Sequence, residues 1–170
     1  MKIEKDNVSI REFTLNDVEK KVEWINNPEN NQYLHYNIPL SVEGTTKWFM
    51  NKETFNRLDC VIEYDGVPVG VIGLLEIDHF NKKAEFYITL GATEYKRKGI
   101  ATTATRLIVD YAFDDLQLQK VYLNVDEANE NACRLYEKVG FKCEGIFVKD
   151  MFFKNAWINR RRYAIFSEGK

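Results

Sequence analysis

Apolar and polar residues near the start of the chain change from a two-residue period to a helical period. The alternation over residues 8–13 predicts a strand, and apolar residues at helical spacing over 18–25 predict an amphipathic helix after the capping residues 14–17. Pro28 ends this helix, and a second helical stretch opens at Ser41 and reaches Phe55. A polar, aromatic loop is therefore expected between two N-terminal helices.

Three strands follow one another in the middle of the chain. Runs rich in Val and Ile over residues 58–64 and 67–77 flank Asp65-Gly66, and this dipeptide is a strong hairpin signal because glycine accepts the positive φ of a tight turn. A third strand is predicted over residues 84–90.

Helices and strands alternate in the remaining part of the chain. Helical spacing predicts helices over residues 99–113 and 132–139, with a buried strand over 120–125 between them. A last antiparallel pair covers 141–153 and 157–166. The order predicts a single domain over residues 1–170, with a mixed α/β sheet of about seven strands and about four helices.

Composition and charge exclude several classes of protein. The 170 residues are 45% hydrophobic and carry a formal net charge of −2, so we expect a folded domain that binds neither nucleic acid nor an anionic membrane. Cys60, Cys133 and Cys143 are odd in number and widely spaced, which disfavours a disulfide framework and a zinc site. The N-terminus shows no apolar targeting segment. We therefore expect a cytoplasmic protein without a metal.

A basic turn stands where the predicted strand 84–90 leads into the predicted helix from Gly99. The first amides of a helix have no intrahelical acceptor and the helix dipole is positive there, so this turn is expected to bind an anion such as a diphosphate. Lys96, Arg97 and Lys98 add charge, and Gly99 lets the backbone approach a ligand. An isolated basic triplet is more often a solvated run, and it is the strand-to-helix context that favours a site here.

Two segments resemble motifs of the GNAT family of N-acetyltransferases. Lys96-x-x-Gly99-x-Ala101 resembles the family's Q/R-x-x-G-x-G/A motif for acetyl-coenzyme A, and residues 129–141 resemble its N-x-x-A-x-x-L-Y-E-K-x-G-F segment. Ile10-Arg11 and residues 24–29 resemble the ribosomal-protein N-terminal acetyltransferase-like branch. The likeness departs from the family at Lys96 and Arg97, which keep their backbone amides, and at Ala156 and Asn159.

The resemblance implies a fold and a set of residues that bind acetyl-CoA as co-substrate. The fold is a mostly antiparallel sheet with a splayed strand pair that holds the cofactor, and a backbone N–H near Leu90 would face the oxyanion. The implied cofactor-binding residues are Thr89, Leu90, Gly91, Lys96, Arg97, Lys98, Gly99, Ile100, Ala101, Thr102 and Asn129. Asn129 and Thr102 are also natural helix caps.

Two side chains are candidates for proton transfer. An amine is mostly protonated at neutral pH, so a base must remove a proton before it attacks, and Glu85 matches the family's strand-borne glutamate; the alternative is an exposed strand glutamate, with water relays as the base. Tyr136 matches the family tyrosine that protonates the leaving thiolate; the alternative is a core aromatic residue. Cys133 is interpreted as a small buried residue rather than a nucleophile.

The function implied is transfer of an acetyl group from acetyl-CoA to a primary amine, by direct attack in a ternary complex. The acceptor is a small molecule (amino acid, amino sugar or polyamine) or a peptide N-terminus, and Tyr33, His35 and Tyr36 are weak candidates for binding it, with a structural role the alternative for His35. A possible homodimer is also expected. A non-catalytic sensor of acyl-CoA is the alternative function, and a nucleic-acid-binding domain is disfavoured by the charge.

Overall fold

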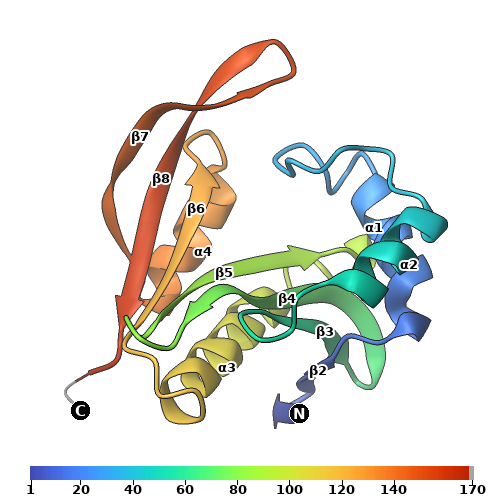
Figure 1. Ribbon diagram of the computed structural model, residues 1–170, viewed down its shortest axis with the longest axis horizontal. Coiled ribbons are helices and arrows are strands. Elements are labelled where there is room, and N and C mark those ends of the chain that lie inside the picture. The colour runs from blue at the N-terminus through green and yellow to red at the C-terminus, as the bar shows by residue number, and fades with distance from the viewer. Residues whose placement is uncertain (169–170) are drawn as a thin grey trace.

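The computed structural model describes residues 1–168 and contains eight strands and four α-helices in that range (Figure 1). The strands are β1 (Lys2–Lys5), β2 (Val8–Glu12), β3 (Leu58–Tyr64), β4 (Val67–Asp78), β5 (Lys83–Leu90), β6 (Lys120–Asp126), β7 (Lys142–Phe153) and β8 (Ala156–Phe166). The helices are α1 (Val18–Asn26), α2 (Val42–Asn51), α3 (Ile100–Asp114) and α4 (Glu130–Val139), with short 3-10 turns at Leu15–Asp17 and Thr93–Tyr95.

All strands belong to one sheet in the order β1-β2-β3-β4-β5-β6-β8-β7. Every neighbouring pair is antiparallel except β5 and β6, which are parallel. The mixed, mostly antiparallel class predicted from the sequence is confirmed. The predicted strand count omits β1, an edge strand whose residues are exposed apart from the half-buried Ile3 and so show no apolar pattern.

The predicted second helix is too long at its C-terminal end. α2 begins after Ser41, whose hydroxyl accepts a hydrogen bond from the Gly44 amide, as a helix cap does. It ends at Asn51, and Phe55, which was expected on the helix, is 81% exposed beyond it. The helical spacing of Phe55 alone therefore did not indicate a further turn of this helix.

The sheet opens between β5 and β6, in the middle of the fold (Figure 1). The two strands pair only from Lys83–Glu85 to Lys120–Tyr122, whereas β5 continues to pair with β4 as far as Leu90. Beyond Glu85 the edge of β5 that faces β6 has no strand partner in the described chain. The splayed strand pair implied by the resemblance is present.

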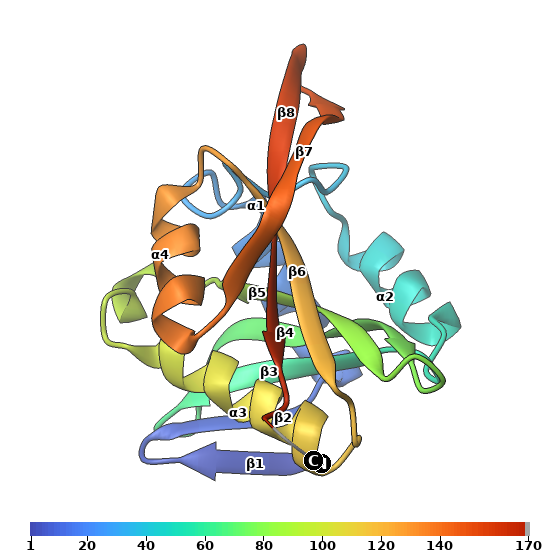
Figure 2. The same cartoon turned by 90° about the vertical axis from the view of Figure 1, so that its left-hand side faces the viewer.

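Helices cover the two faces of the sheet and so divide the apolar core (Figure 2). On one face, α3 packs against β4, β5 and β6 through residues such as Ile100, Ala104 and Ile108. On the other face, α1 supplies Val18 and Trp24 to a smaller cluster with Phe13, Val61 and Val71. Because side chains alternate along a strand, successive residues of β5 face these two layers in turn.

The β7–β8 hairpin projects beyond the rest of the molecule (Figure 2). Lys154 and Asn155 have positive φ angles of 50° and 60°, which gives the tight hairpin turn predicted at this point. The hairpin leaves several large apolar side chains exposed, namely Ile146, Phe147, Val148, Phe152 and Trp157.

Candidate active site

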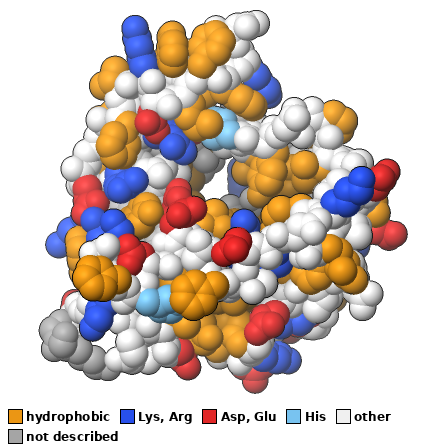
Figure 3. Space-filling view, viewed as in Figure 1, with side chains coloured by type: hydrophobic (Ala, Val, Ile, Leu, Met, Phe, Trp, Pro, Cys, Tyr) orange, Lys and Arg blue, Asp and Glu red, His pale blue; other side chains and the backbone are white. Residues whose placement is uncertain are grey.

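A pocket of about 780 Å³ occupies the opening between β5 and β6. Its walls come from α1, the loop of residues 27–40, β5, β6 and α4, and it includes Glu85, Tyr136 and all three loop residues singled out from the sequence. Figure 3 shows this side of the molecule hollowed between the β7–β8 arm and the α1–α2 side. The predicted catalytic and acceptor-binding residues therefore share one cavity.

The turn predicted to bind an anion leads directly into α3. Gly99 precedes α3 with φ of 74°, a left-handed conformation that suits glycine, and no atom lies within 4 Å of where its Cβ would be. Arg97 also has positive φ, at 65°. The chain thus turns so that the unpaired first amides of α3 follow Gly99 directly. The side chain of Ile100 is buried in the core, which leaves only its backbone available to a ligand.

The basic side chains of this turn are less concentrated on the anion site than the sequence suggests. The Lys96 ammonium donates to Asn30 Oδ1 at 2.7 Å, so it supports the loop after α1. Asn30 in turn donates to the carbonyls of Trp24 and Gly91, at 3.0 and 2.8 Å. Lys98 lies over the Tyr95 ring at 5.9 Å.

The residues at the end of β5 have different environments. Thr89 and Leu90 line the pocket, and Leu90 pairs with Gly70 on its other edge. Gly91 already has partners for both main-chain polar groups: its amide donates to Val69 and its carbonyl accepts from Asn30. A Cβ at Gly91 would collide with the Trp24 side chain. The structure therefore gives Gly91 a packing role, and its contact with cofactor stays a prediction.

Glu85 is half-buried in the pocket rather than exposed on an outer strand face. Its Oε1 accepts a hydrogen bond from Asn124 Nδ2 at 3.1 Å, and Asn124 Oδ1 accepts from Arg162 Nε at 3.1 Å. This relay of an amide and a guanidinium fixes the carboxylate in position. Asn124 and Arg162 were not predicted, because only the register of β6 and β8 brings them to Glu85.

Tyr136 is buried against aromatic rings on the opposite side of β5. Its ring contacts Phe86, Phe141 and Tyr163 at centroid distances of 6.0, 5.8 and 6.3 Å. Burial raises the pKa of the Tyr136 hydroxyl well above its ordinary value, so the phenol keeps its proton at neutral pH. It is a core aromatic residue that also lines the pocket, and its role as a proton donor stays a prediction.

The predicted acceptor loop is fastened across the pocket. His35 Nε2 lies 2.7 Å from Asp126 Oδ1 at the end of β6, and the His35 ring stands edge-on to Phe153 at 4.7 Å. The Tyr33 hydroxyl donates to the Ala128 carbonyl at 3.3 Å. His35 Nδ1 is buried and has no hydrogen-bond partner in the described chain. Asp126 was missed because it is 91 residues away from His35.

A cationic cluster in the pocket wall was also missed. Lys21 and Arg57 line the pocket beside Tyr36 and Tyr87, and Asp59 lies behind them. Burial lowers the pKa of Lys21 to about 8. Burial alone would raise the pKa of Asp59, but hydrogen bonds from Arg57, Lys52 and Tyr87 outweigh it and lower that pKa to about 2. The sequence feature that could have indicated the cluster is Lys21, because it shares the inward face of α1 with apolar residues.

Four further residues singled out from the sequence take local roles. Asn129 Oδ1 accepts from the Ala132 amide at 3.3 Å and so caps α4, although Asn129 also lines the pocket. Ala101 and Thr102 lie in the first turn of α3, next to the free amides. Cys133 is 5% exposed, as expected for a small buried residue.

Residues 1–168 contain no group of three or more His, Cys, Asp or Glu side chains placed to hold a metal ion. None of the described helices combines the length and the apolar character that crossing a membrane requires.

Known proteins resemble this chain in sequence over more than half of its length. Spermidine N(1)-acetyltransferase of Escherichia coli K12 is 42% identical over 106 residues, which cover 62% of this chain and 56% of that protein. The putative ribosomal N-acetyltransferase YdaF of Bacillus subtilis is 35% identical over 98 residues, which cover 58% of this chain and 53% of that protein. The matches thus span just over half of the relatives' length.

Solved structures resemble it over nearly the whole chain. Spermidine N-acetyltransferase from Vibrio cholerae, solved with CoA and spermine, superimposes with a TM-score of 0.86 at 27% identity, over 94% of this chain and 95% of that one. A chimera of the same enzyme gives a TM-score of 0.87 at 26% identity, over 95% and 96%. Residues 7–142 match the family described as the acetyltransferase (GNAT) domain. This chain belongs to the GNAT acetyltransferase family.

Proposed function

We propose that this protein transfers the acetyl group of acetyl-CoA to a primary amine. The observation that carries the proposal is the convergence of Glu85, Tyr136 and the turn before α3 on one pocket in the sheet. The likeness to a structure that holds CoA supports the same cofactor here. The residues present fit CoA, because the turn at Gly99 is open and its amides are free, and because β5 has an unpaired edge beyond Glu85.

The binding residues have separate tasks in this proposal. The amides that open α3 bind the diphosphate, and the edge of β5 near Thr89 and Leu90 offers main-chain groups to the pantetheine arm and to the thioester oxygen. The acceptor enters on the side of β5 that carries Glu85, next to the loop of residues 27–40. The two substrates thus meet at the opening between β5 and β6.

Proton transfer uses one residue on each side of β5. Glu85, held by Asn124, takes a proton from the ammonium of the acceptor, directly or through water, so that the neutral nitrogen can attack the thioester carbon. The carbon–nitrogen bond forms and the carbon–sulfur bond then breaks. Tyr136 gives its proton to the leaving sulfur, and the second proton of the nitrogen, which is lost as the amide forms, passes through water to restore the phenol. Burial keeps the Tyr136 phenol protonated before the step but also makes it a weaker acid, so the transfer is driven by the negative charge that develops on the leaving sulfur.

The proposal is tested by release of the CoA thiol with a panel of amines. We expect thiol release with at least one amine, with kcat reduced in Glu85→Gln and Tyr136→Phe while CoA binding is unchanged. Binding of acetyl-CoA without thiol release for any amine would contradict the transferase and support the acyl-CoA sensor. Absence of CoA binding at millimolar ligand to the folded protein would contradict both.

The acceptor, the assembly and the location complete the proposal. The acceptor is the primary amine of a small molecule or of a peptide N-terminus; polyamines are one class, because relatives are named for spermidine. A homodimer or larger oligomer is supported by the exposed apolar hairpin and by a solved relative described as dodecameric. A cytoplasmic location is supported by Cys60, Cys133 and Cys143, all free thiols.

A further inference from the structure

Lys21 is a buried cation that lines the acceptor side of the pocket. It stands on the inward face of α1, in line with Val18 and Ile25, and only 7% of it is exposed. Its ammonium makes no hydrogen bond and no ion pair with any residue of the described chain. A buried ammonium ordinarily has an anionic or hydrogen-bonding partner. We therefore expect a ligand in the pocket to supply one for Lys21.

Asp59, the acidic group of this cluster, has no acceptor capacity left for Lys21. Its two oxygens accept from Arg57 Nε and Nη2 at 2.8 and 2.9 Å, from Lys52 Nζ at 2.8 Å and from the Tyr87 hydroxyl at 2.6 Å. A carboxylate offers about four lone-pair sites, and these four bonds fill them. Gly73 lies between Asp59 and Tyr87 in the sheet, and a Cβ there would collide with the Leu58 carbonyl oxygen and with the Tyr87 ring, so only glycine leaves room for this arrangement.

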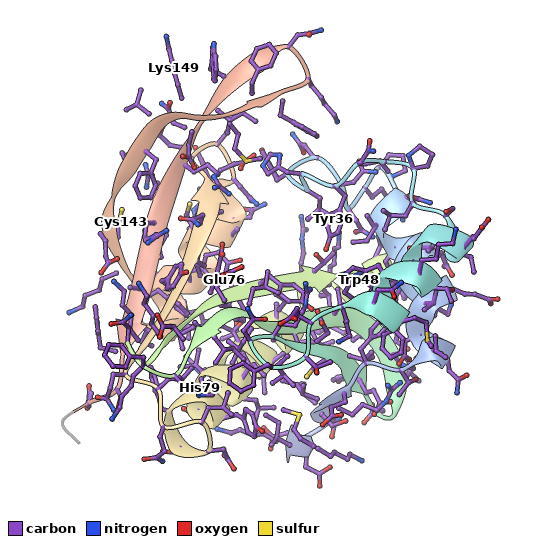
Figure 4. All side chains as sticks on the ribbon, in the orientation of Figure 1. Tyr36, Trp48, Glu76, His79, Cys143 and Lys149 are labelled. Carbon is purple, nitrogen blue, oxygen red and sulfur yellow. The ribbon has the colours of Figure 1, made fainter. Side chains whose placement is uncertain are left out.

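The cluster therefore has more positive than negative charge. Lys21, Lys52 and Arg57 face the single carboxylate of Asp59, so the cluster itself has a surplus of two positive charges; the other carboxylates that line the pocket are Glu85 and Asp126. The ring of Trp48 lies 3.6 Å from Lys21 Nζ, and Tyr36 lies at 5.9 Å, but aromatic faces supply no net charge and no hydrogen-bond acceptor of full strength. Figure 4 labels Tyr36 and Trp48, which come from the loop after α1 and from α2.

The cluster lies beside the proposed base. Glu85 and Tyr87 are two residues apart on β5, so their side chains point to the same side and their Cα atoms are roughly 7 Å apart. An acceptor with its nitrogen at Glu85 would therefore have its other groups near Tyr87, Lys21 and Arg57.

We propose that the acceptor carries an oxyanion, a carboxylate or a phosphate ester, and that Lys21 and Arg57 bind it. This inference rests on the proposed acetyl transfer. An oxyanion would supply the acceptor atoms that Lys21 lacks and would offset the surplus charge. A polycation would meet repulsion at the same place, which is how a pocket rejects a wrong ligand. The inference thus separates this chain from relatives named for spermidine.

The test compares acceptors that differ only in the oxyanion. One arm uses amino acids against their carboxamides, a second uses amino sugars against their phosphate esters, and a third uses spermidine, with thiol release as the readout. We expect kcat/KM in at least one of the first two arms to be roughly 10- to 100-fold higher for the anionic compound, the effect of a hydrogen bond between charged groups. The arm that responds identifies the oxyanion.

Variants assign the preference to Lys21. We expect Lys21→Met to reduce the ratio of anionic to neutral kcat/KM to about one without changing the KM for acetyl-CoA, and Lys21→Arg to keep a ratio above one. Lys20→Met is the matched control, because Lys20 is exposed and pairs with Glu23 outside the pocket, and we expect it to keep the wild-type ratio.

Two results would overturn the inference. Thiol release with neutral amines or spermidine at a kcat/KM equal to or above that of the anionic compounds in both arms would refute it and leave the acetyl transfer standing. A full anionic preference in folded Lys21→Met would also refute it. If no amine releases thiol, the proposed function fails and this inference fails with it.

Discussion

Replacing Lys21 with methionine should stabilise the folded protein at neutral pH. The pKa of Lys21 falls from 10.5 to about 8 on burial, and each pKa unit corresponds to about 1.4 kcal/mol, so the buried ammonium costs roughly 3 kcal/mol. Methionine has similar length and no charge. It loses the attraction to the Trp48 ring, which is worth about 1–2 kcal/mol. The net expectation is a gain of about 1–3 kcal/mol in the free energy of unfolding.

The pH dependence of this gain follows from the sign of the pKa shift. Below about pH 8, Lys21 is protonated in both the folded and the unfolded chain, so the cost is present in full. Between about pH 8 and 10.5 the folded protein releases the proton while the unfolded chain keeps it, and the wild type gains stability relative to the variant. The difference between the two proteins should therefore shrink over this range.

Chemical unfolding in urea at pH 7 and pH 10, with Lys20→Met as the control, measures the effect. Thermal unfolding should show the same order, with a shift of about 2–4 °C per kcal/mol for a domain of this size. If Lys21→Met is less stable than wild type at pH 7, or if the difference is the same at both pH values, the reasoning about a buried, uncompensated ammonium is refuted.

Three further predictions concern the same pocket. Asp59→Asn should lower the free energy of unfolding by about 3–5 kcal/mol, because it leaves Lys52 and Arg57 without their carboxylate; the wild type should lose about 2–3 kcal/mol as pH falls from about 4 to 2, measured by urea unfolding against pH. Gly73→Ala should cost about 3 kcal/mol, because a Cβ there would collide with the Leu58 carbonyl oxygen and with the Tyr87 ring, whereas Gly66→Ala, where a Cβ meets no atom, should cost only about 1 kcal/mol for its positive φ, and equal losses would contradict the packing argument. Tyr136→Phe should lower kcat roughly 100-fold with little change in the KM for acetyl-CoA; an unchanged kcat would exclude it as the proton donor.

Local patterns in the sequence were sufficient for most of the fold. The turn before α3 and the hairpins depend on neighbouring residues, such as Gly99 and Asp65-Gly66, and each lies where it was predicted. β1 was missed because its side chains are almost all exposed, so its stability comes from pairing with β2 rather than from an apolar face. Such an edge strand leaves no periodic signal.

The site was predicted only where a motif is local. Glu85 and Tyr136 could be placed from short segments, and the structure brings both into the pocket. Partners such as Asp126 for His35 depend on strand register and on how a loop crosses the sheet, and spacing along the chain does not encode these distances. Lys21 was missed because a lysine in a charged helix is usually solvated.

In the proposed function, the contact of His35 with Phe153 links the projecting hairpin to the acceptor side of the pocket. His35 is held from two directions, by the Asp126 carboxylate and by a ring that stands next to the hairpin turn. The loop of residues 27–40 thus connects the body of the domain to the β7–β8 hairpin through His35. A neighbouring subunit, or an insertion at Lys154, that displaces the β7–β8 hairpin would therefore move this loop. The entrance proposed for the amine would change shape, although Glu85 and Tyr136 would not be contacted.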